Sequence, residues 1–81
     1  MYFVYILYSG LYDIYYIGQT QNVVERISRH NNRREKATSP YAPWKLMLVI
    51  EKSSRSEAII LERKIKNLNR IRLTQFIDKY K

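Results

Sequence analysis

The chain has 81 residues with a formal net charge of +8 at pH 7, two glycines, two prolines and no cysteine. The missing cysteine excludes disulfides and thiolate metal sites, and the low glycine and proline content argues against a disordered chain. No stretch reaches the length of a membrane span and the N-terminus lacks the basic region of a secretory signal, so we expect a single cytoplasmic domain over residues 1–81 that has no membrane partner.

The first predicted elements are two strands joined by a turn. Residues 2–8 and residues 14–19 are rich in aromatic and β-branched side chains, and the residues between them favour a turn. A loop of residues 9–12 would pair Tyr5 with Tyr16, Leu7 with Ile14 and Phe3 with Gly18. This register places two phenols side by side, and a glycine within a strand indicates that another group approaches its backbone closely.

The sequence pattern in the middle of the chain predicts a helix, a loop and a third strand. Residues 22–31 have a polar start suited to capping, and Val23, Val24 and Ile27 are expected to face inward. Residues 33–43 contain both prolines and are expected to form a loop. Residues 44–50 include an apolar run that indicates a third strand.

Two further helices are predicted in the C-terminal part. Ser54 and Glu57 have capping-box spacing, and they open a helix that extends to about residue 68. The apolar residues of a final helix recur at helical spacing, and they are Leu73, Phe76, Ile77 and Tyr80. The order β-β-α-β-α-α predicts a small α+β domain in which a three-stranded antiparallel sheet is flanked by three helices.

Basic side chains avoid the predicted hairpin and follow the helical regions. Five of the fifteen lysines and arginines lie between Arg26 and Lys36, and seven lie between Arg63 and Lys81. Such an excess of positive charge attracts polyanions, of which nucleic acid is the commonest. The alternative is a solvated basic surface that only aids solubility. The cations expected to contact nucleic acid are Arg29, Arg33, Arg34, Lys36, Arg63 and Lys66.

Glu62 stands out in the second predicted helix because it falls inside the apolar arc, between Ala58 and Ile65. An uncompensated carboxylate at such a position is costly, so it needs a cation, a hydrogen-bonding group or a metal ion. The alternative to a functional carboxylate is a salt bridge to a nearby lysine or arginine. Position alone does not separate the two.

Arg26 and His30 have the spacing of neighbours on one side of the first predicted helix. Taken singly, Arg26 is typical of a surface cation that faces phosphate, and His30 of a cation favoured by the C-terminal end of a helix. The single histidine is poor evidence for a metal site, because no second imidazole or thiolate exists to complete one.

Together these residues resemble the GIY-YIG nuclease superfamily, which is named for tyrosine motifs on its first two strands. The first motif is Phe3-Val4-Tyr5, which keeps only the tyrosine, and the second, Tyr16-Ile17-Gly18, is complete. The family places an arginine on the first helix, often with a histidine or tyrosine one turn later, and a metal-binding glutamate on a later helix. Arg26, His30 and Glu62 match these positions. The resemblance covers nearly the whole chain and is closest to the compact single-domain bacterial branch, which shares the Ser-Arg-Ser-Glu-Ala of residues 54–58.

The resemblance implies a metal-dependent endonuclease that hydrolyses phosphodiester bonds in DNA, branched or nicked, during repair or recombination. Glu62 would hold one Mg²⁺ or Mn²⁺ ion together with waters. Tyr5 would orient or deprotonate the attacking water, and Tyr16 would assist through the hydrogen-bond network. Arg26 would grip a phosphate oxygen, and His30 would relay a proton or contact the phosphate.

The alternative function is a non-cleaving nucleic-acid-binding module with a nuclease-like fold. Both interpretations make nucleic acid, and DNA first, the expected partner. The surface cations would supply binding that does not depend on sequence and weakens with salt. High sequence specificity would therefore need a homodimer or a repair-protein partner.

Overall fold

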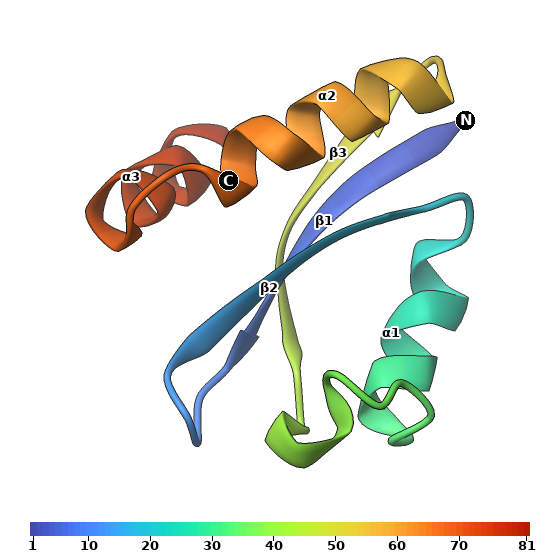
Figure 1. Ribbon diagram of the computed structural model, residues 1–81, viewed down its shortest axis with the longest axis vertical. Helices are drawn as coiled ribbons and strands as arrows, with labels where there is room; N and C mark the ends of the chain where they lie inside the picture. The colour runs from blue at the N-terminus through green and yellow to red at the C-terminus, as the bar shows by residue number, and fades with distance from the viewer.

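The order β-β-α-β-α-α expected from the sequence is confirmed by the computed structural model, which describes residues 1–81 (Figure 1). The elements are β1 (Tyr2–Ser9), β2 (Ile14–Thr20), α1 (Val23–Asn31), β3 (Lys45–Lys52), α2 (Arg55–Lys66) and α3 (Arg70–Tyr80). A short 3-10 helix, η1 (Ser39–Tyr41), lies within the segment that was expected to be a plain loop. None of these helices is long and apolar enough to span a membrane.

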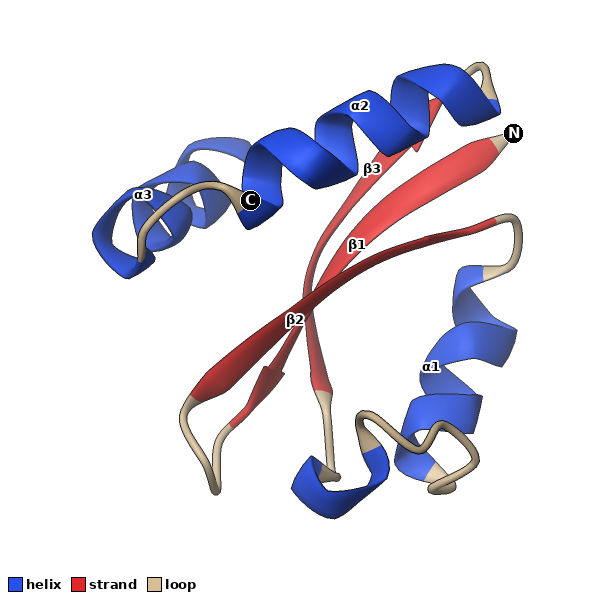
Figure 2. Cartoon of the chain, viewed as in Figure 1, coloured by secondary structure: helices blue, strands red, loops and turns tan.

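The three strands form one antiparallel sheet in the order β2-β1-β3, so β2 is an edge strand and β1 is central. Helices α2 and α3 cover one face of this sheet, whereas α1 and η1 lie against the other (Figure 2). Because side chains alternate along a strand, β1 serves both faces. Val4 and Ile6 pack under α2 and α3, and Tyr5 and Leu7 point toward α1.

The predicted hairpin register is wrong by two residues. Tyr5 pairs with Gly18 and Leu7 pairs with Tyr16, because the loop consists of residues 10–13 instead of 9–12. Ser9 belongs to the strand: it is buried, it pairs with Ile14, and its hydroxyl donates to the carbonyl of Tyr41 at 2.7 Å. A shift by an even number of residues keeps every side chain on its face, so Tyr5 and Tyr16 still share one side of the sheet.

Gly18 is required because the Tyr5 ring crosses the strand pair and lies on it. A Cβ atom at Gly18 would be 2.5 Å from the Tyr5 hydroxyl oxygen and 3.1 Å from the Tyr16 ring. No ordinary side chain fits at these distances. The close approach predicted from a glycine within the strand is therefore confirmed, and the approaching group is the first tyrosine of the hairpin.

Helix α1 differs from the prediction in the side chains that it buries. Val24 was expected to face inward, but 81% of its surface is exposed. The one fully buried residue of the helix is His30, which is 1% exposed. Asn22 caps this helix and Ser54 caps α2, each by accepting a backbone N–H three residues later, as the polar starts of both segments predicted.

Candidate active site

The two hairpin tyrosines and His30 of α1 form one contiguous cluster on the α1 face of the sheet. The ring centroids of Tyr5 and Tyr16 are 6.3 Å apart, and those of Tyr16 and His30 are 5.0 Å apart. The Tyr5 hydroxyl is 3.0 Å from His30 Nε2. The hydroxyl of Tyr16 makes no hydrogen bond within the protein, so its ring belongs to the cluster but its hydroxyl is free.

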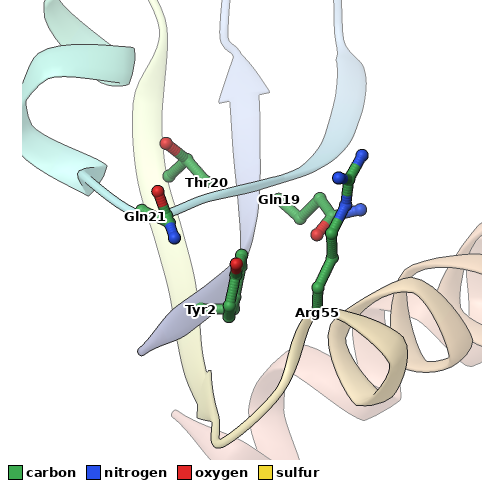
Figure 3. A pocket seen from close by; sticks show the side chains of 5 residues that line it. All are labelled: Tyr2, Gln19, Thr20, Gln21 and Arg55. Atoms are coloured by element: carbon green, nitrogen blue, oxygen red, sulfur yellow. The ribbon is translucent and has the colours of Figure 1, made fainter.

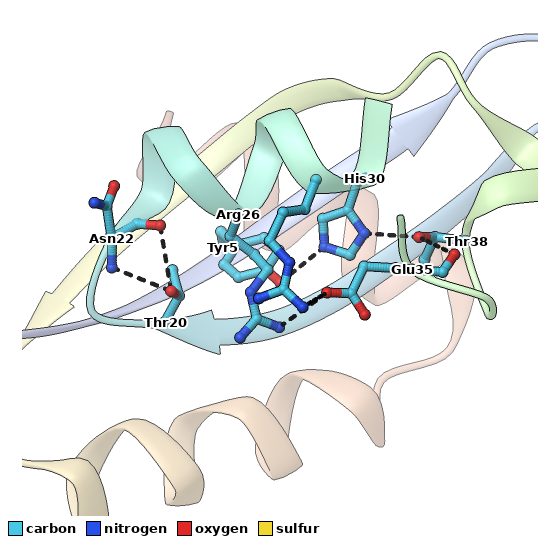
Figure 4. Close-up of polar contacts among 8 residues, drawn as sticks. Tyr5, Thr20, Asn22, Arg26, His30, Glu35 and Thr38 are labelled. Carbon is cyan, nitrogen blue, oxygen red and sulfur yellow. Dashed lines mark hydrogen bonds and ion pairs between the residues drawn. The ribbon is translucent and has the colours of Figure 1, made fainter. Parts of the chain in front are cut away.

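Thr38 completes a buried chain of hydrogen bonds that begins at Tyr5. His30 Nδ1 is 2.7 Å from Thr38 Oγ1, and the Thr38 hydroxyl donates to the backbone carbonyl of Glu35 at 3.4 Å (Figure 4). Because Thr38 uses its proton on that carbonyl, it accepts from Nδ1–H, and Nε2 then accepts from the Tyr5 phenol. The network therefore assigns the Nδ1–H tautomer to His30.

The side chain of Asn31 holds the end of α1 against the start of β3. Its amide nitrogen donates to the carbonyl of Trp44 at 3.1 Å, and its amide oxygen accepts from the backbone N–H of Trp44 at 2.5 Å. The Trp44 indole in turn donates to the carbonyl of Thr38 at 3.0 Å. The bond from Trp44 fixes Thr38, and strand pairing fixes Tyr5. Both residues that contact the His30 ring are therefore held in place.

Arg26 and Arg29 share the carboxylate of Glu35, which comes from the loop after α1. Arg29 is 2.8 Å from a Glu35 oxygen, and Arg26 is 3.9 Å from the same oxygen. The Glu35 carboxylate is therefore closer to Arg29 than to Arg26. Figure 4 shows the Arg26 guanidinium extending past Tyr5 on the side of α1 that faces α2. Arg26 is the cation of this pair that is freer to bind a phosphate.

Burial and neighbouring charges keep Tyr5 and His30 in their neutral forms at pH 7. Burial, supported by Tyr16 and the carboxylates of Glu35 and Glu62, raises the pKa of Tyr5 well above that of an ordinary phenol, although Arg26 opposes the shift. Burial also lowers the pKa of His30 below the usual imidazole value; the carboxylate of Glu35 opposes this shift, and the charges of Arg26 and Arg29 favour it. A neutral phenol thus faces a neutral imidazole.

Glu62 comes from α2, the helix that covers the face of the sheet opposite α1 and the tyrosine cluster. Its side chain is 17% exposed, and one carboxylate oxygen is 3.1 Å from Lys66 Nζ. The salt bridge that the sequence left as the alternative is therefore present. The carboxylate still acts electrostatically on Tyr5, so the two groups lie within reach of one another's charge.

A metal ion would depend on Glu62 alone in this region. No group of three or more histidine, cysteine or acidic side chains converges to hold an ion. Mg²⁺ is commonly bound through one or two carboxylates, with water and substrate phosphate completing the coordination. A half-buried carboxylate whose only partner is the exposed ammonium of Lys66 fits that requirement.

The other predicted nucleic-acid contacts are surface residues, and two of them are already paired. Arg29 binds Glu35 and Lys66 binds Glu62. The remaining four are exposed: Arg33, Arg34 and Lys36 in the loop after α1, and Arg63 on α2. The three loop cations are close in sequence to Glu35 and to Thr38, and Thr38 bonds to His30 of the tyrosine cluster.

Glu35, Thr38 and Asn31 did not emerge from the sequence as functional residues. Thr38 and Glu35 lie in an aperiodic loop, and neither belongs to a recognised motif. The only available signal was that a buried histidine requires two hydrogen-bond partners. That rule predicts that a partner exists without saying which residue supplies it.

Replacing Thr38 by valine tests the assignment of the His30 tautomer. The substitution keeps the shape of the side chain, removes the acceptor of Nδ1–H, and is expected to lower the free energy of unfolding by about 1–3 kcal/mol. The population of the Nδ1–H tautomer should fall. Nitrogen-15 NMR of the His30 ring and urea unfolding measure both effects. Thr38→Ser is the matched control, and equal spectra for the valine and serine variants would contradict the assignment.

The chain is similar to known proteins in sequence and in fold. Residues 1–75 match the family of the GIY-YIG catalytic domain. The chain is also similar to the solution NMR structure of the UPF0213 protein BH0048 from Bacillus halodurans, with 30% sequence identity and a TM-score of 0.63. That match covers 96% of this chain and 84% of the other. No curated protein matches the chain at a significant level.

Proposed function

The chain belongs to the GIY-YIG family, a nuclease superfamily, and from that premise we propose that it is a metal-dependent endonuclease that hydrolyses phosphodiester bonds in DNA. The observation that carries the proposal is the directed chain from the Tyr5 hydroxyl through His30 to Thr38. This chain gives the Tyr5 hydroxyl a neutral imidazole that can accept its proton.

The raised pKa of Tyr5 determines how the phenol serves as a base. A phenol that must first ionise would be almost absent as phenolate at pH 7. In the proposed step, Tyr5 Oη takes the proton of the attacking water while its own proton passes to His30 Nε2, so a neutral phenol is restored. The water oxygen bonds to phosphorus, and the phosphorus–oxygen bond of the leaving group breaks. The leaving oxygen takes a proton from solvent, and His30 returns its extra proton to solvent, so the protons balance.

The added negative charge on the phosphate needs positive partners. Arg26 supplies a planar donor for a phosphate oxygen, and its weak engagement with Glu35 leaves it available. Glu62 would hold a divalent ion, Mg²⁺ or Mn²⁺, which supplies Lewis-acid charge for the phosphate and the leaving oxygen when it is bound. Nucleic-acid contacts by Arg33, Arg34 and Lys36 would position the strand without reading its sequence.

Substitution of Arg26 by alanine tests the proposal directly. Removal of one charge-assisted phosphate contact is expected to lower kcat/KM about 10- to 150-fold, while the fold is retained. Plasmid, nicked and branched DNA are incubated with Mg²⁺ or Mn²⁺, and with EDTA as the blank. Arg72→Ala removes an exposed arginine of α3 that has no ionic partner, and it should cleave like wild type.

The second candidate function is a nucleic-acid-binding module that does not cleave. It is favoured by the burial of Tyr5, which is only 1% exposed, and by the pairing of Glu62 with Lys66. The same experiment separates the two functions. Tight, salt-sensitive DNA binding without metal-dependent cleavage of any DNA or RNA would establish the module and refute the nuclease.

We also propose that any sequence selectivity comes from assembly. Contacts between surface cations and phosphates do not distinguish bases. A second copy of the chain or a repair protein would then select the site on DNA. Measurement of the mass of the complex on branched DNA, for example by light scattering, tests whether two copies bind together.

A further inference from the structure

A hollow outside the tyrosine cluster opens where β2 ends and α2 begins (Figure 3). It has a volume of about 290 Å³ and is lined by Tyr2, Gln19, Thr20, Gln21 and Arg55. Figure 3 shows the side chains of Tyr2 and Gln21 on one side and those of Gln19 and Arg55 on the other. None of these five residues belongs to the chain of hydrogen bonds around His30, and none was assigned a role from the sequence.

The polar groups that line this Tyr2–Arg55 hollow are unused within the protein. The side chains of Tyr2, Gln19 and Gln21 make no hydrogen bond, and Arg55 forms no ion pair. Thr20 alone is occupied, by a local bond between its hydroxyl and the backbone of Asn22. The hollow therefore presents an aromatic ring, two carboxamides and a guanidinium to whatever enters it.

This combination of groups matches the chemistry of a nucleotide. A phenol ring offers a face on which any base can stack. Carboxamides both donate and accept, so they pair with base edges, and a guanidinium binds phosphate oxygens. No carboxylate lines the hollow and Tyr2 is its only hydrophobic residue, so an anion is favoured over a cation or a lipid chain. The volume of about 290 Å³ lies just below the range of about 300–1,000 Å³ for small-molecule sites, which suits one nucleotide.

The hollow is also at the right distance from the tyrosine cluster to hold the same strand. Gln19 directly follows Gly18, and the Tyr5 hydroxyl oxygen lies on Gly18. Residues of an extended strand advance about 3.3 Å each, so Gln19 to Gln21 lie roughly 3–10 Å along the strand from that point. Gln19 pairs with Val4, so its side chain projects from the face covered by α2 and not from the face of the tyrosine cluster. Phosphates of a nucleic-acid strand recur about every 3.4 Å along the axis of B-DNA. The two places are on opposite faces of the sheet, and the outer edge of β2 pairs with no strand, so a DNA strand that occupies both would pass around this edge.

We propose that the Tyr2–Arg55 hollow binds one unpaired nucleotide of the DNA strand whose neighbouring phosphate lies at Tyr5 and Arg26. A base within a duplex is covered on both faces by its neighbours, whereas an unpaired base has a face free for the Tyr2 ring. The nuclease is thus directed to DNA with a single-stranded segment beside the cut. The assignment of the neighbouring phosphate rests on the proposed nuclease function.

Binding of two DNA hairpins in EDTA tests the proposal without any cleavage. One hairpin carries a short single-stranded overhang and the other is blunt. Wild type should bind the overhang at least about 5-fold more tightly in fluorescence anisotropy. Tyr2→Leu, which keeps an apolar side chain against the core, and Arg55→Ala should remove that preference. Arg72→Ala, the matched loss of an exposed arginine, should keep the wild-type preference for the overhang.

NMR titration separates this site from the nuclease proposal. Thymidine 5′-monophosphate should shift the side-chain amide signals of Gln19 and Gln21 in wild type, whereas inorganic phosphate should not. Equal affinity for the two hairpins in wild type, or an unchanged preference in Tyr2→Leu, would overturn the proposal. Equal shifts with phosphate would overturn it as well. A failure of cleavage alone would instead count against the nuclease function, because neither experiment requires catalysis.

Discussion

Replacement of Tyr5 by phenylalanine is expected to lower kcat for DNA cleavage by about 10²- to 10⁴-fold, the usual contribution of a positioned acid–base group. The substitution keeps the ring that packs on Gly18 and removes the hydroxyl that bonds His30 Nε2 at 3.0 Å. The variant should lose about 1–3 kcal/mol of stability, because the buried Nε2 is left without a donor. Cleavage is therefore measured at a temperature where urea unfolding shows both proteins to be folded.

Tyr8 provides the matched control for Tyr5. It lies on the same strand and its hydroxyl is also hydrogen-bonded, at 2.6 Å to a carboxylate oxygen of Asp13, but this bond is on the surface. Tyr8→Phe should cleave like wild type. If Tyr5→Phe also retained most of the wild-type kcat, the base would have to be another group. The first to test would be Tyr16, because its hydroxyl is free.

The acid limb of the pH–rate profile should report His30. Protonated imidazole cannot accept the Tyr5 proton, so cleavage falls as the pH drops through the pKa of His30. That pKa lies below the ordinary value of about 6.5, because burial disfavours the charged ring. The unfolded chain binds this proton at a higher pH than the folded one, so the free energy of unfolding also decreases as the pH falls below about 6.5. Parallel rate and unfolding measurements separate the two effects.

The elements could be predicted from the sequence because each depends on local pattern and capping. Residues 2–8 alternate as a strand, and Ser54 with Glu57 marks the start of a helix. The register could not be predicted in the same way. It depends on whether Ser9 belongs to the strand or the turn, and that is decided by its bond to Tyr41, 32 residues away.

Only part of the candidate site could be predicted from local sequence pattern. The spacing of Arg26 and His30 and the faces of the tyrosines follow from helical and strand periods, so both could be anticipated. Thr38 and Glu35 come from an aperiodic loop whose path is set by Trp44 and Asn31. The face of the sheet that is covered by α2, the helix of Glu62, could not be inferred either, because helical periodicity says which side of a helix is buried but not which face of the sheet the helix covers.

Replacement of Glu62 by glutamine is expected to abolish metal-dependent cleavage while leaving DNA binding in EDTA unchanged. The amide keeps the size of the side chain and removes the only carboxylate suited to an ion beside this site. Removal of an outer partner of a metal ligand typically costs about 10- to 100-fold in activity. Removal of the ligand itself should therefore lower activity by more than about 100-fold. Broadening of α2 amide signals by Mn²⁺ measures ion binding independently of catalysis, and it should vanish in the variant.

Two further variants of α2 distinguish an ion ligand from a structural ion pair. Glu57→Gln removes an exposed glutamate that accepts from Ser53, and it should leave both cleavage and Mn²⁺ broadening intact. Lys66→Ala removes the ion pair between Lys66 and Glu62, which is worth only about 0.3–0.5 kcal/mol. The variant should therefore bind Mn²⁺ slightly more tightly than wild type. Unchanged broadening in Glu62→Gln would mean that Glu62 serves only Lys66.

Glu62 and Arg26 come from helices that pack on opposite faces of the sheet, which allows a sharper test of this prediction. Arg26 projects from α1 and Glu62 from α2, so one phosphate can involve both only at the free edge of β2. If both act on the same phosphate, the double variant Arg26→Ala with Glu62→Gln should lose little more activity than the worse single variant, because groups that act as a unit are non-additive. Losses that multiply would place the two residues at separate points on the DNA and rule out a shared catalytic centre at this edge.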